Sequence, residues 1–170
     1  QKTAYEIPKR DWSSDVCSSD LKGNEITSAV YTTKDQKLHG TLTMVRELSN
    51  GATSKSKVVF DYDDTINNIA KQMIEVGGLY GSFNIQSIVD CNNTVHPFEI
   101  NCRISGTNSI RHNFGFKDVV YTVQEYLLGI VPEQPQRTQG IATRILMDVI
   151  YPNAVDETLL NNVTHPHKVY

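Results

Sequence analysis

Apolar and polar residues alternate along much of the chain after residue 22, and this pattern predicts a series of β-strands. The predicted strands cover residues 25–33, 37–48, 58–60, 81–90, 94–103 and 141–151. The first two form an antiparallel hairpin around a turn at 34–37. One side of its second strand is apolar and carries Leu38, Leu42, Met44 and Leu48. The small polar residues 49–57 predict a loop between strands.

Two further segments have the period of amphipathic helices, with apolar residues three and four positions apart. The first begins where Asp63-Asp64-Thr65 supply N-cap side chains, and it ends at Gly77-Gly78. Its predicted core-facing stripe is Ile66, Ile69, Ala70, Met73 and Val76. The second helix covers 118–129 and ends at Gly129, and its predicted core-facing residues are Val119, Val120, Val123 and Leu127. Strands and helices in this order predict an α+β fold, an antiparallel sheet with packed helices.

Residues 1–21 follow no structural pattern, and we exclude them from the domain. The segment DWSSDVCSSDL (Asp11–Leu21) has neither a helical nor a strand period. With one choice of codons it back-translates to a string that resembles a common sequencing-library adapter, and Gln1–Ile7 resemble the outer half of the same adapter. We therefore interpret residues 1–21 as an artefactual, adapter-derived segment.

The composition of the remaining chain excludes several classes of function. The excluded segment has three basic and four acidic residues, so the rest keeps about −2 of the formal net charge of −3. A chain so close to neutral does not favour nucleic acid or a membrane surface as a partner. Its two cysteines, Cys91 and Cys102, do not make a disulfide framework. No apolar run approaches the ~20 residues of a membrane span.

The pair of strands around Asn92-Asn93 gathers polar side chains on one face. If these two asparagines are the centre of a tight turn, Gln86 lies opposite Glu99 and Asn84 lies opposite Asn101. The other face is then apolar. The predicted polar face carries Asn84, Gln86, Glu99 and Asn101, with Arg103 at its end.

Such a face has the residue types of a magnesium–phosphate site. Facing side chains lie roughly 4.5–5.5 Å apart at Cβ, and carboxylate and carboxamide oxygens at that spacing can coordinate Mg²⁺. A neighbouring arginine would pair with phosphate oxygens. Spacing alone leaves a second interpretation open, in which the polar residues are only the solvated face of an edge hairpin.

The stretch GSFNIQSIVDCNNTVHPFEINCRISGTNS (residues 81–109) resembles the metal-binding hairpin of ATP-grasp enzymes, most closely those related to the carbamoyl-phosphate synthetase large subunit. The resemblance continues through FGFKDVVYTVQEYLLG and begins upstream in GNEITSAVYTT and KLHGTLTMVRELSNGAT, so it covers about Gly23 to Ile150. It implies the C-terminal subdomain of an ATP-grasp fold, with a domain at 22–150 and a tail at 151–170. The family often has Pro at the position of Cys102, which we expect to matter little because that side chain points to the apolar face.

The resemblance also implies roles for individual residues. Gln86, Glu99 and Asn101 would bind Mg²⁺ or Mn²⁺ and, through it, ATP. Arg103 would contact the ATP phosphates and Glu25 the nucleotide. Arg46 would act in catalysis, lying with the loop Asn50–Ser54 over the phosphates or the acyl substrate.

The implied reaction is activation of a carboxylate by ATP to an acyl phosphate, which an amine or another nucleophile then attacks. We expect positioning and charge stabilisation to carry this chemistry, without a protein nucleophile. The lysine and hinge of the nucleotide site would precede Lys22, so the chain is expected to be inactive alone and active when full-length, in the cytoplasm. The oligomeric state is open, a homo-oligomer included.

Two other interpretations of the chain's function are open. The chain could be a noncatalytic ATP-binding or structural relative, or an unrelated α+β binding domain whose polar hairpin face has no cleft.

His39 and His96 fit structural places better than catalytic ones. His112, together with Arg111, is a weaker candidate for substrate contact because its loop follows the metal-binding strand.

Overall fold

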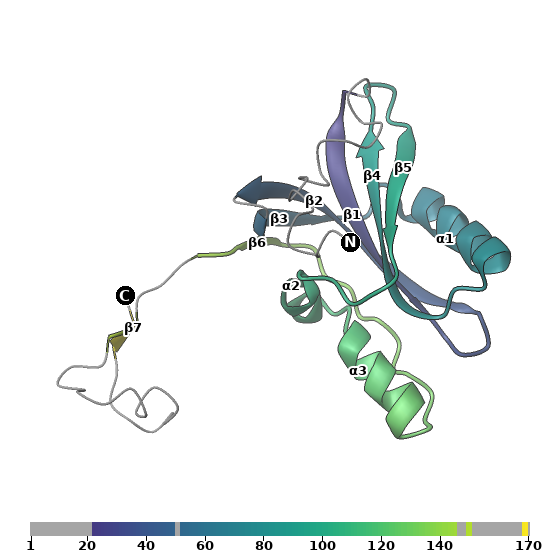
Figure 1. Ribbon diagram of the computed structural model, residues 1–170. Helices are drawn as coiled ribbons and strands as arrows, with labels where there is room; N and C mark the ends of the chain where they lie inside the picture. Colours follow the sequence, from purple (N-terminus) through teal and green to yellow (C-terminus); the bar gives the residue numbers. More distant parts are fainter. Residues whose placement is uncertain (1–21, 50–51, 146–148, 151–167, 170) are drawn as a thin grey trace, which may run out of the picture.

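The computed structural model describes residues 22–49, 52–145, 149–150 and 168–169 (Figure 1). Its centre is a six-stranded antiparallel sheet in the order β5-β4-β1-β2-β3-β6. The strands are β1 (Asn24–Thr32), β2 (Leu38–Ser49), β3 (Ala52–Val59), β4 (Gly81–Val89), β5 (Val95–Asn101) and β6 (Ile141–Thr143). The helices are α1 (Asp63–Gly77), α2 (Asn108–Asn113) and α3 (Asp118–Thr122), and α3 continues into the π-helix η2 (Val123–Leu127). The predicted α+β class is confirmed.

Two short strands lie outside this sheet. β7 (Val149–Ile150) pairs with β8 (Lys168–Val169) in a two-stranded ladder. In the described part of the chain, no helix is long and apolar enough to cross a membrane.

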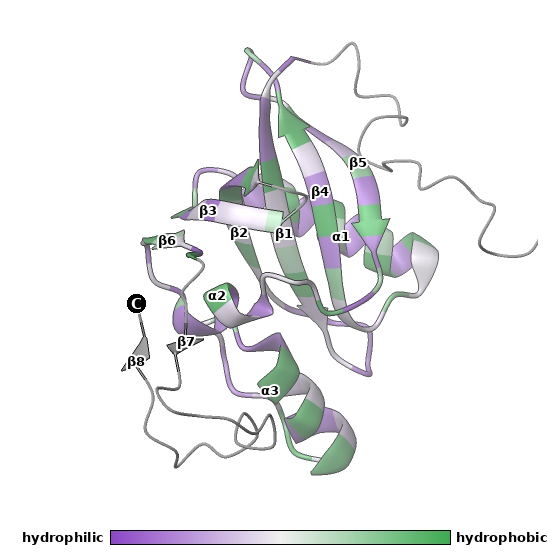
Figure 2. Cartoon of the chain, turned by 60° about the vertical axis from the view of Figure 1, so that its left-hand side comes forward, coloured by the Kyte–Doolittle hydropathy of each residue, from purple (hydrophilic) through white to green (hydrophobic). Residues whose placement is uncertain are grey.

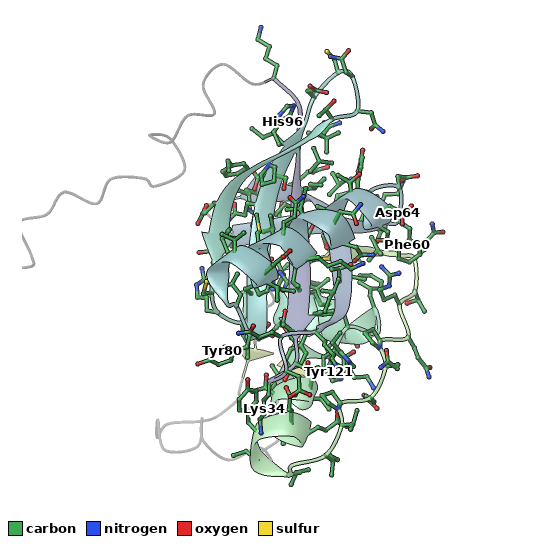
Figure 3. All side chains as sticks on the ribbon, turned by 90° about the vertical axis from the view of Figure 1, so that its right-hand side faces the viewer. Lys34, Phe60, Asp64, Tyr80, His96 and Tyr121 are labelled. Carbon is green, nitrogen blue, oxygen red and sulfur yellow. The ribbon has the colours of Figure 1, made fainter. Side chains whose placement is uncertain are left out.

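The sheet is covered on both faces. Figure 3 shows α1 lying across one face, where its buried residues Ala70 and Ile74 pack against Val30, Phe83 and Ile85. On the opposite face the core joins the sheet to the segment of α2 and α3 and contains Ala29, Tyr31, Leu42, Met44, Val58, Phe116 and Tyr121. Both faces of β1 are therefore buried from Ile26 onward, which suits its β-branched and small residues.

The side-chain alternation predicted for β4 is confirmed. Figure 2 shows hydrophobic and hydrophilic residues alternating along this strand. Phe83 and Ile85 face α1, whereas Asn84 and Gln86 face the opposite side of the sheet. The polar face of the β4–β5 hairpin therefore lies opposite the helix-covered face.

Glu125 ties η2 to the turn between β1 and β2. Its carboxylate accepts hydrogen bonds from the Tyr31 hydroxyl (2.9 Å) and from the Lys34 backbone amide (2.9 Å). Lys34 and Tyr121 accordingly lie at the same end of the molecule (Figure 3). Burial, together with the hydrogen bond to Glu125, raises the pKa of Tyr31 far above its ordinary value, so this hydroxyl remains a donor at neutral pH.

The loop predicted at 49–57 is wrong from Ala52 onward, where β3 begins; residues 50 and 51 lie outside the described residues. Lys55 and Lys57 are exposed whereas Ser56 and Val58 are buried, which is the alternation of a strand, and Thr53 is buried as well. Small hydroxyl residues can occupy a sheet interior because β3 pairs on both sides, with β2 and β6. Leu48, predicted to be core-facing, is exposed.

The first helix begins and ends where expected, but its details differ. Tyr62 holds the N-cap position and no side chain caps the helix, whereas Asp63 lies in the first turn and pairs with Arg137 (2.8 Å). Gly78 adopts a left-handed conformation at the C-cap (φ +61°) and donates its amide to Ile74 O. Val76 is 90% exposed, and Ile74 takes its place in the core because Ile66, Ala70 and Ile74 follow an exact four-residue spacing.

The prediction for 118–129 is partly wrong. The segment is helical, but Val119, Val123 and Leu127 are exposed and Val120 is half-buried, whereas Tyr121 and Asp118 are buried. The difference begins in α3, where Asp118 and Tyr121 take the buried positions, and from Val123 onward the backbone has π instead of α geometry. Gly129 follows with φ +67° and ends the segment.

Two other boundaries differ from the prediction. The short helix α2 was not predicted at all. The last strand, expected at 141–151, is two short strands, β6 in the main sheet and β7 in the two-stranded ladder. Arg144 and Ile145 follow β6, and residues 146–148 and 151 lie outside the described residues.

Candidate functional site

The cross-strand pairs predicted for the polar hairpin are confirmed. Gln86 faces Glu99, Asn84 faces Asn101, and Ile85 faces Ile100 on the opposite side of the sheet. Two amides and a carboxylate are thereby held on adjacent strands by the hydrogen-bonded ladder itself.

The turn that leads to this register is not the predicted one. The Asp90 amide bonds Thr94 O (3.0 Å), which closes a three-residue loop, and Asn93 takes the left-handed conformation (φ +62°). A bulge on β5 then shifts the register by one residue, because Ser87 pairs with Pro97 while Gln86 pairs with Glu99. The longer loop and the bulge compensate each other, so the predicted pairs hold from Gln86 onward.

A polar pocket of ≈300 Å³ lies on this face. Its walls come from β2, β3, β4 and β5, from the loop that precedes α2, and from the residue that follows β6. The lining residues are Arg46, Ala52, Thr53, Asn84, Gln86, Asn101, Arg103, Ser105, Gly106, Thr107 and Arg144. The third interpretation, a hairpin face without a cleft, is therefore wrong.

Arg46 connects two of the predicted site residues. Its Nε donates to Glu25 Oε1 (2.9 Å), and its NH2 group donates to the same carboxylate oxygen and to Gln86 Oε1 (2.8 Å). The Arg46 and Glu25 side chains are partly buried, 15% and 31% exposed, so their charges are only partly screened by water. The structure thus brings Glu25, Arg46 and Gln86 together.

Glu99 and Asn101 form a second group at the edge of the sheet. Asn101 Nδ2 donates to Glu99 Oε1 (2.8 Å), and Asn101 Oδ1 and Glu99 Oε2 have no donor among the described residues. Glu99 is exposed and is not among the residues that line the pocket. Within the described ranges, no cluster of three or more His, Cys, Asp or Glu side chains could hold a metal. The predicted ligand set contains one carboxylate and two amides.

Two arginines face the pocket without an ionic partner in the described part of the chain. Arg103 makes only a long hydrogen bond to Ile104 O (3.4 Å). Arg144 donates from NH2 to Gly106 O (3.1 Å), while its backbone amide bonds Ser54 O (2.7 Å). Sequence analysis missed Arg144 because it treated residues 141–151 as one regular strand. Its position follows from β6 pairing with β3, which no local pattern reveals.

Arg111 is fully buried beneath the pocket, while His112 is exposed. Arg111 NH2 donates to Asn84 Oδ1 and to Ser105 Oγ (2.9 Å), and NH1 lies 3.7 Å from the Asp118 carboxylate. Neither Arg111 nor His112 lines the pocket, so the structure does not place His112 at the site. His39 bonds Glu133 O (2.9 Å) and His96 bonds Asp90 (2.9 Å), which are structural places.

Solved structures share this architecture. The phosphoribosylaminoimidazole carboxylase ATPase subunit from Aquifex aeolicus matches 84% of the chain with a TM-score of 0.59 and 12% identity. Phosphoribosylglycinamide synthetase from Anaerococcus prevotii matches 81% with a TM-score of 0.56 and 16% identity. These structures are ATP-grasp enzymes. The chain has an ATP-grasp fold.

The likeness covers only part of each ATP-grasp structure. The chain spans 44% of the Aquifex protein and 40% of the Anaerococcus protein. A carboxyaminoimidazole ribonucleotide synthase from Aspergillus clavatus, solved with ATP, matches 72% of the chain and 34% of its own length, with 17% identity and a TM-score of 0.51. No family profile matches the sequence, and no curated protein matches it. At these identities the likeness shows the fold, and an unrelated α+β fold is excluded.

Proposed function

We propose that this chain is the C-terminal part of an ATP- and Mg²⁺-dependent ligase that converts a carboxylate to an acyl phosphate for attack by an amine or another nucleophile. The observation that carries this proposal is the convergence of Gln86, Asn101, Arg46 and Arg103 on one polar pocket, with Glu99 at its edge. The ATP-grasp fold and the ATP-bound relative from Aspergillus support it.

The residues present fit a divalent cation. In the described part of the chain, Glu99 Oε2 and Asn101 Oδ1 have no donor, and Gln86 Oε1 keeps one lone pair beyond its bond from Arg46. Mg²⁺ and Mn²⁺ favour such oxygen ligands, and Mg²⁺ is usually held by one or two carboxylates together with water and substrate phosphates. When bound, the ion would neutralise phosphate charge in the transition state.

The protein side of the mechanism is electrostatic. Arg103 has no anionic partner among the described residues, so its guanidinium is available to phosphate oxygens. Arg46 is held by Glu25 and Gln86 and would present a fixed charge without reorganising during the reaction. Neither residue needs to exchange a proton, which agrees with a reaction that depends on positioning.

The proposal includes an organisation for the whole protein. Residues 22–150 form the ATP-grasp portion, 151–170 a tail, and the remaining nucleotide-binding subdomains belong to the part of the protein before Lys22. The fragment alone would then be inactive. We place the full-length enzyme in the cytoplasm, with ATP and a small carboxylate as its ligands.

The test is Mg²⁺-dependent ATP turnover by the full-length protein, with residues 1–21 replaced by the native upstream sequence. Glu99→Ala should reduce turnover by a factor on the order of 10² to 10³, comparable to removing one preorganised electrostatic group from an active site. The matched control is Glu75→Ala, which removes an exposed carboxylate from α1. Wild-type protein without metal-dependent turnover would contradict the ligase proposal.

A noncatalytic relative is the second candidate, and the exposure of Glu99 favours it. The same assays separate the two functions, because a noncatalytic domain would bind ATP without turning it over. Glu99→Ala would then weaken binding without changing a rate.

A further inference from the structure

Arg111 occupies an unusual position for a charged residue. It lies on α2, its side chain is fully buried, and its nearest carboxylate is Asp118, which is also buried. Its Nε and NH1 atoms have no hydrogen-bond partner among the described residues. A buried guanidinium with incomplete pairing costs stability, and an apolar side chain of similar size would avoid that cost. The two hydrogen bonds of its NH2 group indicate the role of Arg111.

The first contact fixes the orientation of Asn84. Asn84 Oδ1 accepts hydrogen bonds from Arg111 NH2 and from Thr27 Oγ1 (2.9 Å). A guanidinium can only donate, so the carboxamide oxygen must face Arg111 and the amide nitrogen must point the other way. Asn84 lines the polar pocket, and its Nδ2 makes no hydrogen bond within the described residues. Asn84 therefore offers the pocket an N–H donor.

The second contact fixes the directions of two hydroxyl groups. Ser105 Oγ accepts from Arg111 NH2 (2.9 Å) and from the Thr107 backbone amide (3.1 Å). With both lone pairs used, the Ser105 hydroxyl proton must be donated to Thr107 Oγ1, 2.7 Å away. The proton of the Thr107 hydroxyl is then free to point into the pocket that Thr107 lines.

We propose that Arg111 is a positioning residue for oxyanion binding: through Asn84 and Ser105 it turns the Asn84 amide and the Thr107 hydroxyl toward the pocket as hydrogen-bond donors. Together with Arg103 and Arg144, these groups supply hydrogen-bond donors to the pocket, while Asn101 in its lining and Glu99 at its edge supply oxygens. The ligand is an oxyanion, either a phosphate group or a carboxylate.

Two physical conditions support this arrangement. Burial lowers the pKa of Arg111 to about 10, and the charge of Asp118 opposes this effect, so the guanidinium stays protonated at neutral pH and cannot become an acceptor. Ser82 Oγ also donates to Asp118 (3.0 Å), which fixes the carboxylate beside Arg111. Asp118 is therefore a buried counter-charge 3.7 Å from Arg111 NH1.

The inference rests on the proposed function only in the identity of the molecule that carries the anion. Anion binding by the protein therefore tests the inference, and no turnover assay is needed. Dissociation constants of inorganic phosphate, acetate and Mg²⁺-ADP are measured by calorimetry on the full-length protein. Phosphate and acetate distinguish the two oxyanions, and Mg²⁺-ADP identifies a nucleotide phosphate. Asn84→Asp replaces the amide donor with a carboxylate that still pairs with Arg111, so this variant should fold and bind the preferred anion at least tenfold more weakly.

A double-mutant cycle distinguishes positioning from general stabilisation. Arg111→Met and Asn84→Ala should each weaken anion binding about tenfold, and the double variant should lose much less than the product of the two losses, because Arg111 acts partly through Asn84. Arg111→Lys, which keeps the positive charge and the N–H donors of a single nitrogen, should restore part of the affinity. Thermal melts of each variant establish that it is folded.

Several results would overturn the inference. Wild-type affinity for all three probes in Asn84→Asp would show that the amide is not a ligand donor, and this holds even if Arg111→Met fails to fold. A loss of affinity in the double variant equal to the product of the two single losses would show that Arg111 acts independently of Asn84. A wild-type protein that binds none of the probes also refutes it. Absent ATP turnover with intact anion binding would refute the ligase proposal alone.

Discussion

Gln86 of β4 and Glu99 of β5 are cross-strand partners, and Arg46 holds the Gln86 oxygen from the neighbouring side. The pair therefore joins two environments, one where a guanidinium supplies donors and one where Glu99 and Asn101 supply oxygens. A cation at Glu99 and an anion at the arginines would lie within one pocket and its rim. Such a division suits a metal-bound phosphate ligand.

Glu99→Gln should raise the Mg²⁺ concentration needed for half-maximal ATP turnover about tenfold or more, because an amide replaces the one carboxylate of the proposed ligand set. The measurement is turnover against Mg²⁺ at saturating ATP in the full-length protein. Glu47→Gln, an exposed carboxylate on β2, should leave the Mg²⁺ requirement unchanged. An unchanged requirement in Glu99→Gln would remove this residue from the metal site.

Arg46→Met should destabilise the domain by roughly 1–2 kcal/mol, since it leaves the partly buried Glu25 carboxylate and the Gln86 oxygen without their donor. Urea unfolding of the full-length protein measures the change. Lys55→Met provides the comparison, because Lys55 pairs with Glu47 at the surface over 3.5 Å and should contribute below about 1 kcal/mol. Equal effects of the two substitutions would show that the Arg46 bonds are no stronger than a surface contact.

The pairs that make the site could be predicted because the side-chain period of a strand is short and the two asparagines mark the turn. The prediction assumed a two-residue loop and a regular β5, and both assumptions were wrong. The left-handed Asn93 and the bulge before Glu99 offset each other. A correct register at Gln86 therefore depended partly on chance, since neither feature has a strong sequence signal.

The remaining errors share one physical cause. The part of β3 before Val58 was missed because its hydroxyl side chains are buried by two neighbouring strands. Arg144 was missed because the residue after β6 reaches the pocket from far along the chain. Arg111 was considered only as a loop residue that could contact substrate together with His112. Each of these features depends on tertiary contacts, which override local propensity and periodicity.

The choice between Ile74 and Val76 as the core residue of α1 can be tested directly. Ile74→Ala should cost about 2–5 kcal/mol because it opens a cavity between α1 and the sheet, whereas Val76→Ala should change stability by less than about 0.5 kcal/mol. Chemical denaturation of both variants gives the comparison. A larger loss of stability in Val76→Ala than in Ile74→Ala would instead support Val76 as the core residue, as the apolar periodicity predicts.

The turn between β4 and β5 should make stability depend on pH in the acid range. Asp90 accepts hydrogen bonds from His96 and from the Thr94 and Asn92 amides, and these bonds, led by the one from His96, hold its pKa below the ordinary value of 3.8. A carboxyl whose folded pKa is depressed contributes stability above its unfolded pKa and loses it as the pH falls through the folded pKa.

The melting temperature of the wild-type protein should therefore fall as the pH is lowered from about 5 to below the ordinary aspartate value, and Asp90→Asn should reduce that fall. The substituted amide cannot titrate, so the variant starts from a lower melting temperature near pH 5 and approaches the wild type in acid. Asp35→Asn, at the exposed β1–β2 turn, should keep the wild-type profile. If Asp90→Asn and the wild type show parallel profiles, the hydrogen bonds at this turn do not contribute to the acid response.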